Sequence, residues 1–193
     1  AKRLVWGKHL NGGQTCVAPD YVLIDADLKS EFIKLYKKEI TTAYGENPKE
    51  SEDYPRIVNN KNFNRLKSML KGLTVVIGGE TDEDELYIAP TLVDEPSMES
   101  EVMKDEIFGP ILPVLGYKTE EDINAVISNF DKPLSFYIFS TTKKFTDRML
   151  SKYSFGGGCI NDAIVHYANH NLPFGGTGNS GVGNYHGKFT FET

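Results

Sequence analysis

Short apolar runs alternate with amphipathic helical patterns along most of this 193-residue sequence. The apolar runs, each the length of a buried strand, are residues 21–24, 73–77, 111–115 and 134–139. Apolar side chains at helical spacing occupy residues 28–40, 60–71, 123–130 and 145–153. Strands that alternate with helices favour a sheet with helices on its faces. The sequence therefore predicts an α/β fold, with an open, largely parallel twisted sheet flanked by helices in one domain.

The helical patterns have predicted inner faces. Over residues 28–40, one face carries Leu28, Phe32, Leu35, Tyr36 and Ile40. Over residues 60–71, the inward side chains are expected to be Phe63, Leu66 and Leu70. Thr119 and Asp122 resemble a capping pair, which predicts a helix start immediately before residues 123–130.

Pro113 and an acidic run interrupt the regular pattern. Because Pro113 lacks the N–H that a strand donates to its neighbour, residues 111–115 are expected to form an edge strand or an irregular segment. Residues 80–85 carry five acids, which are the ligand type of a calcium loop. The central Gly and terminal Glu of an EF-hand are missing, however, so a solvated surface turn is the favoured interpretation.

Composition limits the classes of protein to which the chain belongs. Hydrophobic residues make up 39% of it, too many for a disordered chain. No apolar run approaches the ~20 residues of a membrane helix, and the first residues do not form a signal peptide. The formal charge of −6 argues against a nucleic-acid partner. The only cysteines are Cys16 and Cys159, which make no disulfide scaffold, so we expect a reducing compartment, the cytoplasm.

Cys16 follows a glycine-rich turn, Gly12-Gly13-Gln14-Thr15. Free backbone N–H groups in such a turn lower a thiol pKa and stabilise a developing oxyanion, which makes Cys16 a candidate nucleophile. The alternative is a small buried core residue, because free cysteines are commonly buried. Cys159, which enters an apolar segment after three glycines, is interpreted as structural.

A second candidate is the sequence Glu106-Ile107-Phe108-Gly109-Pro110. Gly109 and Pro110 restrict the backbone and hold Glu106 and Phe108 in a fixed presentation. A carboxylate accepts two hydroxyl hydrogen bonds, as when it binds a ribose. The alternative is a surface acid before a turn.

Three further patterns are weaker. Residues 176–181 match G-x-G-x-x-G, but no convincing strand leads into them, so a tightly turning loop is expected in place of a dinucleotide fingerprint. His166 and His170 have the spacing of two zinc ligands, but the glutamate that follows the first His in zinc proteases is missing, and no metal is expected. His9 and His186 are interpreted as surface or locally hydrogen-bonded residues.

Taken together, the segments resemble the aldehyde dehydrogenase superfamily over essentially the whole chain. GlyGlnThrCys at 13–16 resembles the nucleophile motif of this superfamily, and GluIlePheGlyPro at 106–110 resembles its cofactor-ribose motif. ProPheGlyGly at 173–176, together with AsnSerGly at 179–181, resembles its late loop. The class 3 and fatty aldehyde dehydrogenase branch is resembled by residues 16–23, 161–166 and 183–193.

The resemblance implies an activity and roles for four residues. Cys16 would attack an aldehyde to give a thiohemiacetal, and loss of hydride to NAD or NADP would leave a thioester that water hydrolyses to a carboxylic acid. Glu106 would hold the nicotinamide ribose, Phe108 would position the ring, and Phe174 would line the substrate pocket. The full-length protein would be a homodimer.

The resemblance also implies what residues 1–193 lack. Family members carry a cofactor-binding domain, a general-base glutamate and an oxyanion-hole asparagine before the nucleophile, and residues 1–15 match none of them. We therefore expect residues 1–193 to be the catalytic domain alone and to be inactive in isolation. The fatty aldehyde branch leaves membrane attachment through a later tail open.

Two alternatives remain at this point. Related dehydrogenases pass the thioester to coenzyme A or reduce an acyl phosphate with a similar cysteine. A non-catalytic module that serves assembly is the other, because an apolar patch without its covering domain promotes association.

Overall fold

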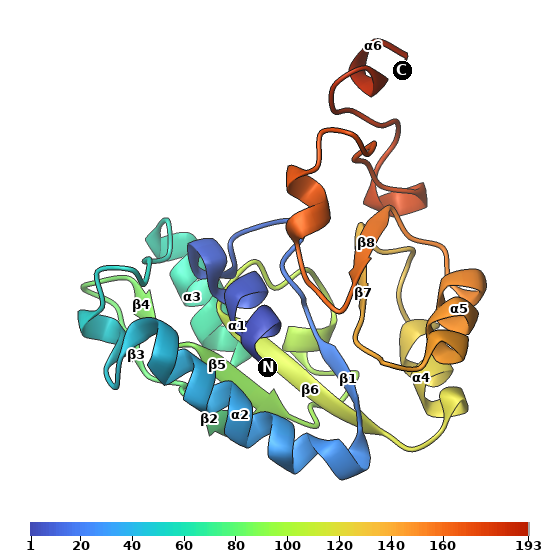
Figure 1. The fold of residues 1–193 in the computed structure, drawn as a ribbon. Helices are drawn as coiled ribbons and strands as arrows, with labels where there is room; N and C mark the ends of the chain where they lie inside the picture. Colours follow the sequence, from blue (N-terminus) through green and yellow to red (C-terminus); the bar gives the residue numbers. More distant parts are fainter. Residues whose placement is uncertain (193) are drawn as a thin grey trace. The chain divides into compact units, whose positions relative to one another are not determined.

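The computed structural model describes residues 1–192, which divide into a first unit of residues 1–122 and a second unit of residues 123–192 (Figure 1). The helices are α1 (Lys2–His9), α2 (Ala26–Tyr44), α3 (Asn60–Met69), α4 (Glu120–Ile127), α5 (Lys143–Lys152) and α6 (Phe189–Glu192). The strands are β1 (Val22–Asp25), β2 (Val75–Ile77), β3 (Thr81–Asp82), β4 (Tyr87–Ile88), β5 (Thr91–Asp94), β6 (Ile111–Tyr117), β7 (Ser135–Ile138) and β8 (Gly157–Ile160). Short 3-10 turns are η1 (Leu10–Gly13), η2 (Pro48–Glu50), η3 (Glu101–Met103), η4 (Val165–Ala168) and η5 (Gly178–Ser180). That all 193 residues form one catalytic domain stays a prediction.

A four-stranded sheet in the order β1-β6-β5-β2 organises the first unit. β6 pairs in parallel with β1 on one side and with β5 on the other, whereas β2 is antiparallel to β5. Five consecutive residues of β6, Ile111 to Leu115, are buried, so both faces of the central strand are covered. The predicted α/β class with a largely parallel sheet is confirmed.

The prediction that Pro113 places its strand at an edge is wrong, because β6 lies between β1 and β5. The carbonyls of Pro110 and Val114 both accept hydrogen bonds from the β5 side, so the alternating backbone turns Pro113 toward β1. The first residue pair between the two strands is Val22 with Val114. The pairing of β6 with β1 therefore begins at Val114, one residue after Pro113. Because Pro113 lies just before this pairing, its missing N–H is tolerated.

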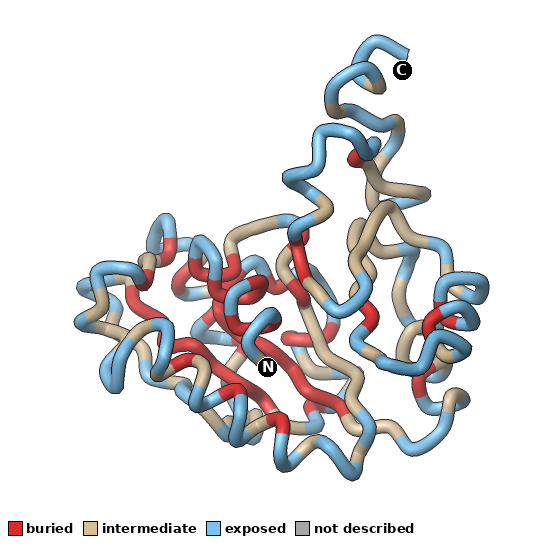
Figure 2. The backbone as a smooth tube through the Cα atoms, in the orientation of Figure 1, coloured by how far each residue is buried: buried red, intermediate tan, exposed pale blue. Residues whose placement is uncertain are grey.

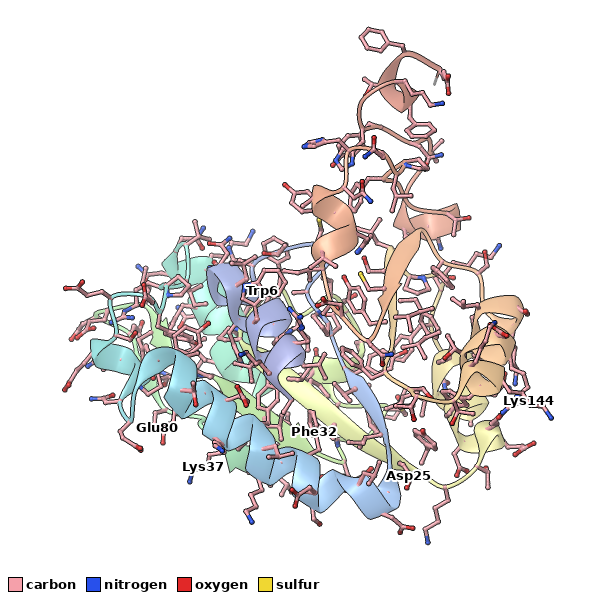
Figure 3. The ribbon with its side chains drawn as sticks, in the orientation of Figure 1. Trp6, Asp25, Phe32, Lys37, Glu80 and Lys144 are labelled. Atoms are coloured by element: carbon pink, nitrogen blue, oxygen red, sulfur yellow. The ribbon has the colours of Figure 1, made fainter. Side chains whose placement is uncertain are left out.

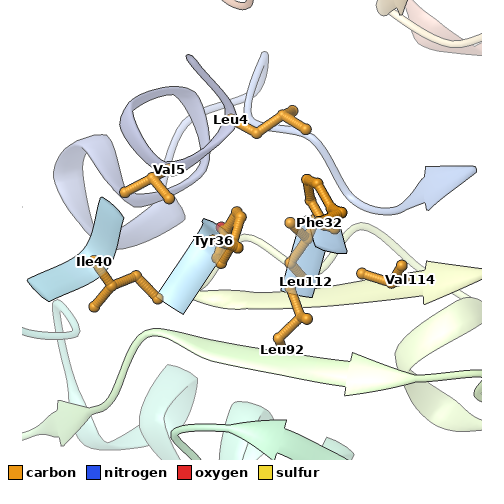
Figure 4. Close-up of a cluster of buried hydrophobic side chains, with 8 residues drawn as sticks. All are labelled: Leu4, Val5, Phe32, Tyr36, Ile40, Leu92, Leu112 and Val114. Carbon is orange, nitrogen blue, oxygen red and sulfur yellow. The ribbon is translucent and has the colours of Figure 1, made fainter. Parts of the chain in front are cut away.

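One hydrophobic core cluster of the first unit lies between helices α1 and α2 and the sheet (Figure 4). Its members are Leu4, Val5, Phe32, Tyr36, Ile40, Leu92, Leu112 and Val114. The buried stripe of α2 is narrower than predicted, because it follows Phe32, Tyr36 and Ile40 at a spacing of four. The other two predicted members, Leu28 and Leu35, are 60% and 40% exposed. Figure 2 shows this burial along β5 and β6, and Figure 3 shows Lys37 on the outer side of α2.

The acidic run at residues 80–85 forms the turn of the β3–β4 hairpin. Lys49 Nζ lies 2.6 Å from Asp82 and 3.1 Å from Glu85, and Arg56 lies 3.0 Å from Glu85. Lys67 lies 3.6 Å from Glu83. The run is therefore a surface turn, as predicted, although three of its acids make ion pairs. Within residues 1–192, no group of three or more His, Cys, Asp or Glu side chains is arranged to hold a metal ion.

The second unit contains a parallel pair of strands, β7 and β8, connected through α5. Phe136 of β7 packs on Tyr153 and Phe155, with ring centroids 5.8 Å and 5.1 Å away. Residues 176–181 form a turn around η5, and no strand leads directly into it, in agreement with the interpretation of this segment as a loop. None of the helices within residues 1–192 has both the length and the apolar character that crossing a bilayer requires.

Candidate active site

The turn that carries Cys16 begins where α1 ends. Asn11, Gly12 and Gly13 have φ angles of 53°, 65° and 74°, so three consecutive residues adopt the left-handed conformation. This conformation suits glycine and is tolerated by asparagine. The chain thereby reverses after α1 and presents Cys16 on the far side of the turn.

Gln14 fixes the turn through its side chain. Its Nε2 donates to the carbonyls of Asn11 and Arg56, at 2.9 Å and 3.1 Å, and its Oε1 accepts from the N–H of Val58 at 2.9 Å. Asn11 Nδ2 donates in return to the Gln14 carbonyl at 3.0 Å. The amide of Gln14 therefore uses both donors and its acceptor to hold the backbone that precedes Cys16.

The Cys16 turn packs directly against the segment that carries Glu106. A Cβ added to Gly13 would lie 2.2 Å from the carbonyl oxygen of Gly109, and one added to Gly109 would lie 2.4 Å from Leu66 of α3. Asp20 Oδ1 accepts a hydrogen bond from the N–H of Ile107 at 3.0 Å. The two predicted motifs, far apart in sequence, are thus in backbone contact within the first unit.

Arg65 of α3 holds the Glu106 segment from the other side. Its Nη2 donates to the Ile107 carbonyl at 2.7 Å, and its Nη1 donates to the Glu106 carbonyl at 3.5 Å. Phe108 has a φ angle of 48° and is 38% exposed. Arg65 and Asp20 therefore fix the backbone of residues 106–107, while the side chains of Glu106 and Phe108 lie on the surface.

Cys16 is exposed, and neither its thiol nor its N–H makes a hydrogen bond within residues 1–192. The structure therefore places Cys16 outside the core, against the alternative of a small buried residue. Both groups are accessible to a ligand.

Lys8 is the charged group buried behind this site. It lies in the last turn of α1, is fully buried, and its Nζ has no hydrogen-bond partner within residues 1–192. Burial lowers the pKa of Lys8 to about 8, while the carboxylates of Asp20 and Glu106 oppose this effect. Partial burial of the Glu106 carboxyl raises its pKa, as does Asp20, whereas Lys8 and Arg65 lower it.

Phe174, the predicted substrate-pocket residue, lies in the second unit. It is 8% exposed and packs among rings whose centroids lie 5.4 Å to 6.0 Å away. These rings belong to His166, Tyr167, Tyr185 and His186. Phe174 is therefore held in an aromatic cluster, which the sequence pattern did not indicate.

The remaining cysteine and histidines have local partners. Cys159 of β8 lies with its Sγ 3.6 Å from His166 Nδ1, and burial raises the pKa of its thiol. Of the two interpretations of His9, the surface position is wrong because the residue is fully buried, and it is a hydrogen-bonded residue whose Nε2 lies 2.9 Å from the hydroxyl of Tyr36. The reason is its position on α1, where it faces α2 and a group of tyrosine rings.

Sequence reasoning missed Lys8, Asp20 and Arg65. Lys8 and Arg65 are lone basic residues in helices, and such residues are normally solvated. Asp20 lies between Pro19 and a strand, as a turn residue would. Only contacts between segments far apart in sequence assign them to the site.

The chain matches the model of the aldehyde dehydrogenase family over residues 1–193. It is 48% identical to 4,4'-diaponeurosporen-aldehyde dehydrogenase of Staphylococcus aureus, over all of this chain and 42% of that protein. It is 46% identical to aldehyde dehydrogenase family 3 member A2 of Rattus norvegicus, over all of this chain and 40% of that protein. The chain thus spans about two-fifths of the length of these relatives.

A solved structure described as the substrate-bound state of Staphylococcus aureus AldH superimposes with a TM-score of 0.96. The two sequences are 48% identical, and the superposition covers 99% of this chain and 42% of that one. The expected resemblance is confirmed, including its link to the class 3 branch through the family 3 relative. The chain belongs to the aldehyde dehydrogenase family.

Proposed function

We propose that the chain supplies the nucleophile-bearing part of an NAD(P)-dependent aldehyde dehydrogenase, which oxidises aldehydes to carboxylic acids. The observation that carries the proposal is the accessible Cys16, on a turn whose backbone packs against the Glu106 segment. Membership of the family makes aldehyde oxidation the expected reaction class.

Cys16 is the proposed nucleophile. Its thiolate adds to the aldehyde carbon, and the carbonyl electron pair moves to oxygen to give a tetrahedral thiohemiacetal. The Cys16 N–H, which has no partner within residues 1–192, is available to donate to that oxygen. Departure of hydride from the carbon then leaves a thioester on Cys16, which water cleaves to the acid and the free thiol.

The residues of this chain fit the sugar of a nicotinamide cofactor. The Glu106 carboxylate is on the surface, makes no hydrogen bond within residues 1–192, and stands on a backbone fixed by Asp20 and Arg65. A carboxylate so placed accepts two hydroxyl hydrogen bonds, and the exposed Phe108 beside it positions a ring. When bound, NAD or NADP supplies the hydride acceptor.

The substrate is proposed to be an apolar aldehyde, with Phe174 as part of the pocket wall. The aromatic rings that surround the buried Phe174 support an apolar surface. One relative is named for 4,4'-diaponeurosporen-aldehyde, a substrate of that protein. We propose in addition that the full-length enzyme is a cytoplasmic homodimer without a nucleic-acid or metal partner, which the resemblance and the two free cysteines support.

Replacement of each cysteine tests the nucleophile. In the full-length enzyme, Cys16→Ala should lower kcat for aldehyde oxidation by about 10³-fold or more, because no other group replaces the thiolate. The matched control, Cys159→Ala, should leave kcat within about twofold. Retention of activity by Cys16→Ala would exclude Cys16 as the nucleophile.

Alkylation separates a catalytic site from a module that serves assembly alone. Iodoacetamide should modify Cys16 of the 193-residue chain selectively over Cys159, whose thiol is shielded beside His166. Mass spectrometry of tryptic peptides reports both rates. Equal alkylation rates of the two cysteines would favour the assembly module. In a separate assay of the full-length enzyme, turnover that depends on coenzyme A would favour the acyl-transfer branch.

A further inference from the structure

Lys8 is a fully buried lysine whose Nζ has no hydrogen-bond partner within residues 1–192. A buried ammonium is costly unless charges or hydrogen bonds compensate for its lost hydration. Such a group is retained most readily where its charge acts on a neighbour. The question is which groups lie within reach of that charge.

Lys8 lies where the two segments of the site meet, because a Cβ added to Gly13 would lie 3.0 Å from the Lys8 carbonyl oxygen and 2.2 Å from that of Gly109. One carboxylate of each segment acts on its ammonium. Asp20 follows the Cys16 turn, Glu106 opens the cofactor motif, and both interact electrostatically with the ammonium. Asp20 is fixed by its hydrogen bond from the Ile107 N–H, so the two acids are held on joined backbones. The other charged groups in this set are Arg65, which acts on Glu106, and His9, which is influenced by Lys8.

We propose that Lys8 is a positioning residue for cofactor binding: its buried ammonium is the fixed counter-charge that keeps the Glu106 carboxylate ionised against its partial burial and the repulsion of Asp20. This inference rests on the proposed role of Glu106 as the ribose-binding residue. An ionised carboxylate is an acceptor only and receives both sugar hydroxyls, whereas a protonated one turns one oxygen into a donor. Lys8 thus sets the lower pH limit of cofactor affinity without touching the cofactor.

The charge of Lys8 is tested directly on the 193-residue chain. The ¹³C resonance of the Glu106 carboxyl, assigned with Glu106→Gln, reports its pKa by NMR titration. Lys8→Met keeps the length and the apolar stem and should raise the titration midpoint of Glu106 by about one pH unit. The matched control is Lys2→Met, on the exposed side of the same helix, which should leave the midpoint unchanged.

A second variant with the opposite sign keeps the test decisive if Lys8→Met does not fold. Asp20→Asn retains an oxygen to accept from the Ile107 N–H but removes the negative charge. It should lower the midpoint of Glu106. An unchanged Glu106 midpoint in either variant that folds overturns the inference, because the proposed balance of charges requires both shifts.

Cofactor affinity in the full-length enzyme supplies the functional readout. The Kd of NAD, followed by quenching of protein fluorescence, should be weaker for Lys8→Met than for wild type at pH 5.5, by at most about tenfold, the limit that a shift of one pH unit sets, and within about twofold at pH 8. Glu106→Gln should weaken binding at both pH values. An unchanged Kd for Glu106→Gln would refute the ribose role of Glu106, whereas an unchanged Glu106 midpoint in Lys8→Met would refute the role of Lys8 alone.

Discussion

At the scale of single residues, the two glycines of the Cys16 turn differ in how well they would tolerate a Cβ atom. Gly12 and Gly13 both have left-handed φ angles. A Cβ on Gly12 would have ordinary contacts at 3.4 Å, whereas one on Gly13 would overlap the Gly109 carbonyl. The two positions therefore separate conformational strain from steric overlap.

Gly13→Ala should lower the free energy of unfolding by about 3 kcal/mol, and Gly12→Ala by about 1 kcal/mol, since only the first adds overlap to left-handed strain. Trp6, the one tryptophan of the sequence, lies on α1 and reports unfolding of the first unit in urea. In Gly13→Ala, but not in Gly12→Ala, the alkylation of Cys16 should become slower or lose its selectivity over Cys159. Equal destabilisation by the two substitutions would contradict the close contact with Gly109.

His9 makes the stability of the first unit dependent on pH. Burial, and then the charge of Lys8, lower the pKa of His9 to about 3 from 6.5. Because the folded pKa lies below the unfolded one, the contribution of His9 is complete above pH 6.5 and is lost as the pH falls toward 3. The free energy of unfolding should therefore fall by up to about 1.4 kcal/mol per pH unit below pH 6.5.

The variant His9→Gln stays neutral over this range and retains a polar partner for Tyr36. Urea unfolding at pH 7 and pH 5.5 should show a smaller loss of stability in His9→Gln than in wild type. The same slope in both proteins would mean that other groups carry the pH dependence.

The buried ammonium of Lys8 lowers the free energy of unfolding at neutral pH. Its pKa is lowered from 10.5 to about 8, so its contribution is complete only above pH 10.5 and is lost as the pH falls through 8. At pH 7 the ionised group is unfavourable by up to about 3 kcal/mol. Lys8→Met should therefore raise the free energy of unfolding at pH 7 and remove its rise between pH 8 and pH 10. A less stable Lys8→Met would show that the ammonium stabilises the fold.

At the scale of elements, α4 is the helix whose start the sequence defines. Thr119 Oγ1 accepts from the Asp122 N–H at 3.2 Å, and Asp122 Oδ2 accepts from the Thr119 N–H at 2.9 Å. This reciprocal pair confirms the predicted capping. The N-cap of helix α5 is Thr142, whose side chain makes no capping hydrogen bond. Thr142 therefore serves as the uncapped control for Thr119.

Thr119→Ala should destabilise α4 by about 1 kcal/mol, since the first N–H groups lose an acceptor. Amide hydrogen exchange over residues 120–127 should accelerate about fivefold. Thr142→Ala, the control, should leave exchange in α5 nearly unchanged. Comparable acceleration in both helices would indicate that Thr119 acts by intrinsic propensity and not as a cap.

At the scale of the whole molecule, the resemblance predicts that the site needs groups beyond residues 1–193. The resemblance to the family assigns the general base and the second oxyanion donor to a segment before the nucleophile, and residues 1–15 match neither. Residues 1–193 alone are therefore predicted not to turn over aldehydes. NADH formation with a panel of aldehydes, compared with the full-length enzyme, measures this. Sustained turnover by the 193 residues would place the missing base within them.

Neighbouring residues were enough to predict most elements and the reactive motifs of this protein. Alternating periodicities predicted β1, α2, α3 and β6, and local composition drew attention to Cys16 and Glu106, because period, caps and turns are properties of neighbouring residues. The tertiary structure decided what depends on distant contacts. It placed Pro113 in a central strand, buried His9 and Lys8, and joined Asp20 to Ile107. Burial and pairing arise between segments far apart in the sequence, such as Asp20 and Ile107, which are 87 residues apart, and no local pattern encodes them.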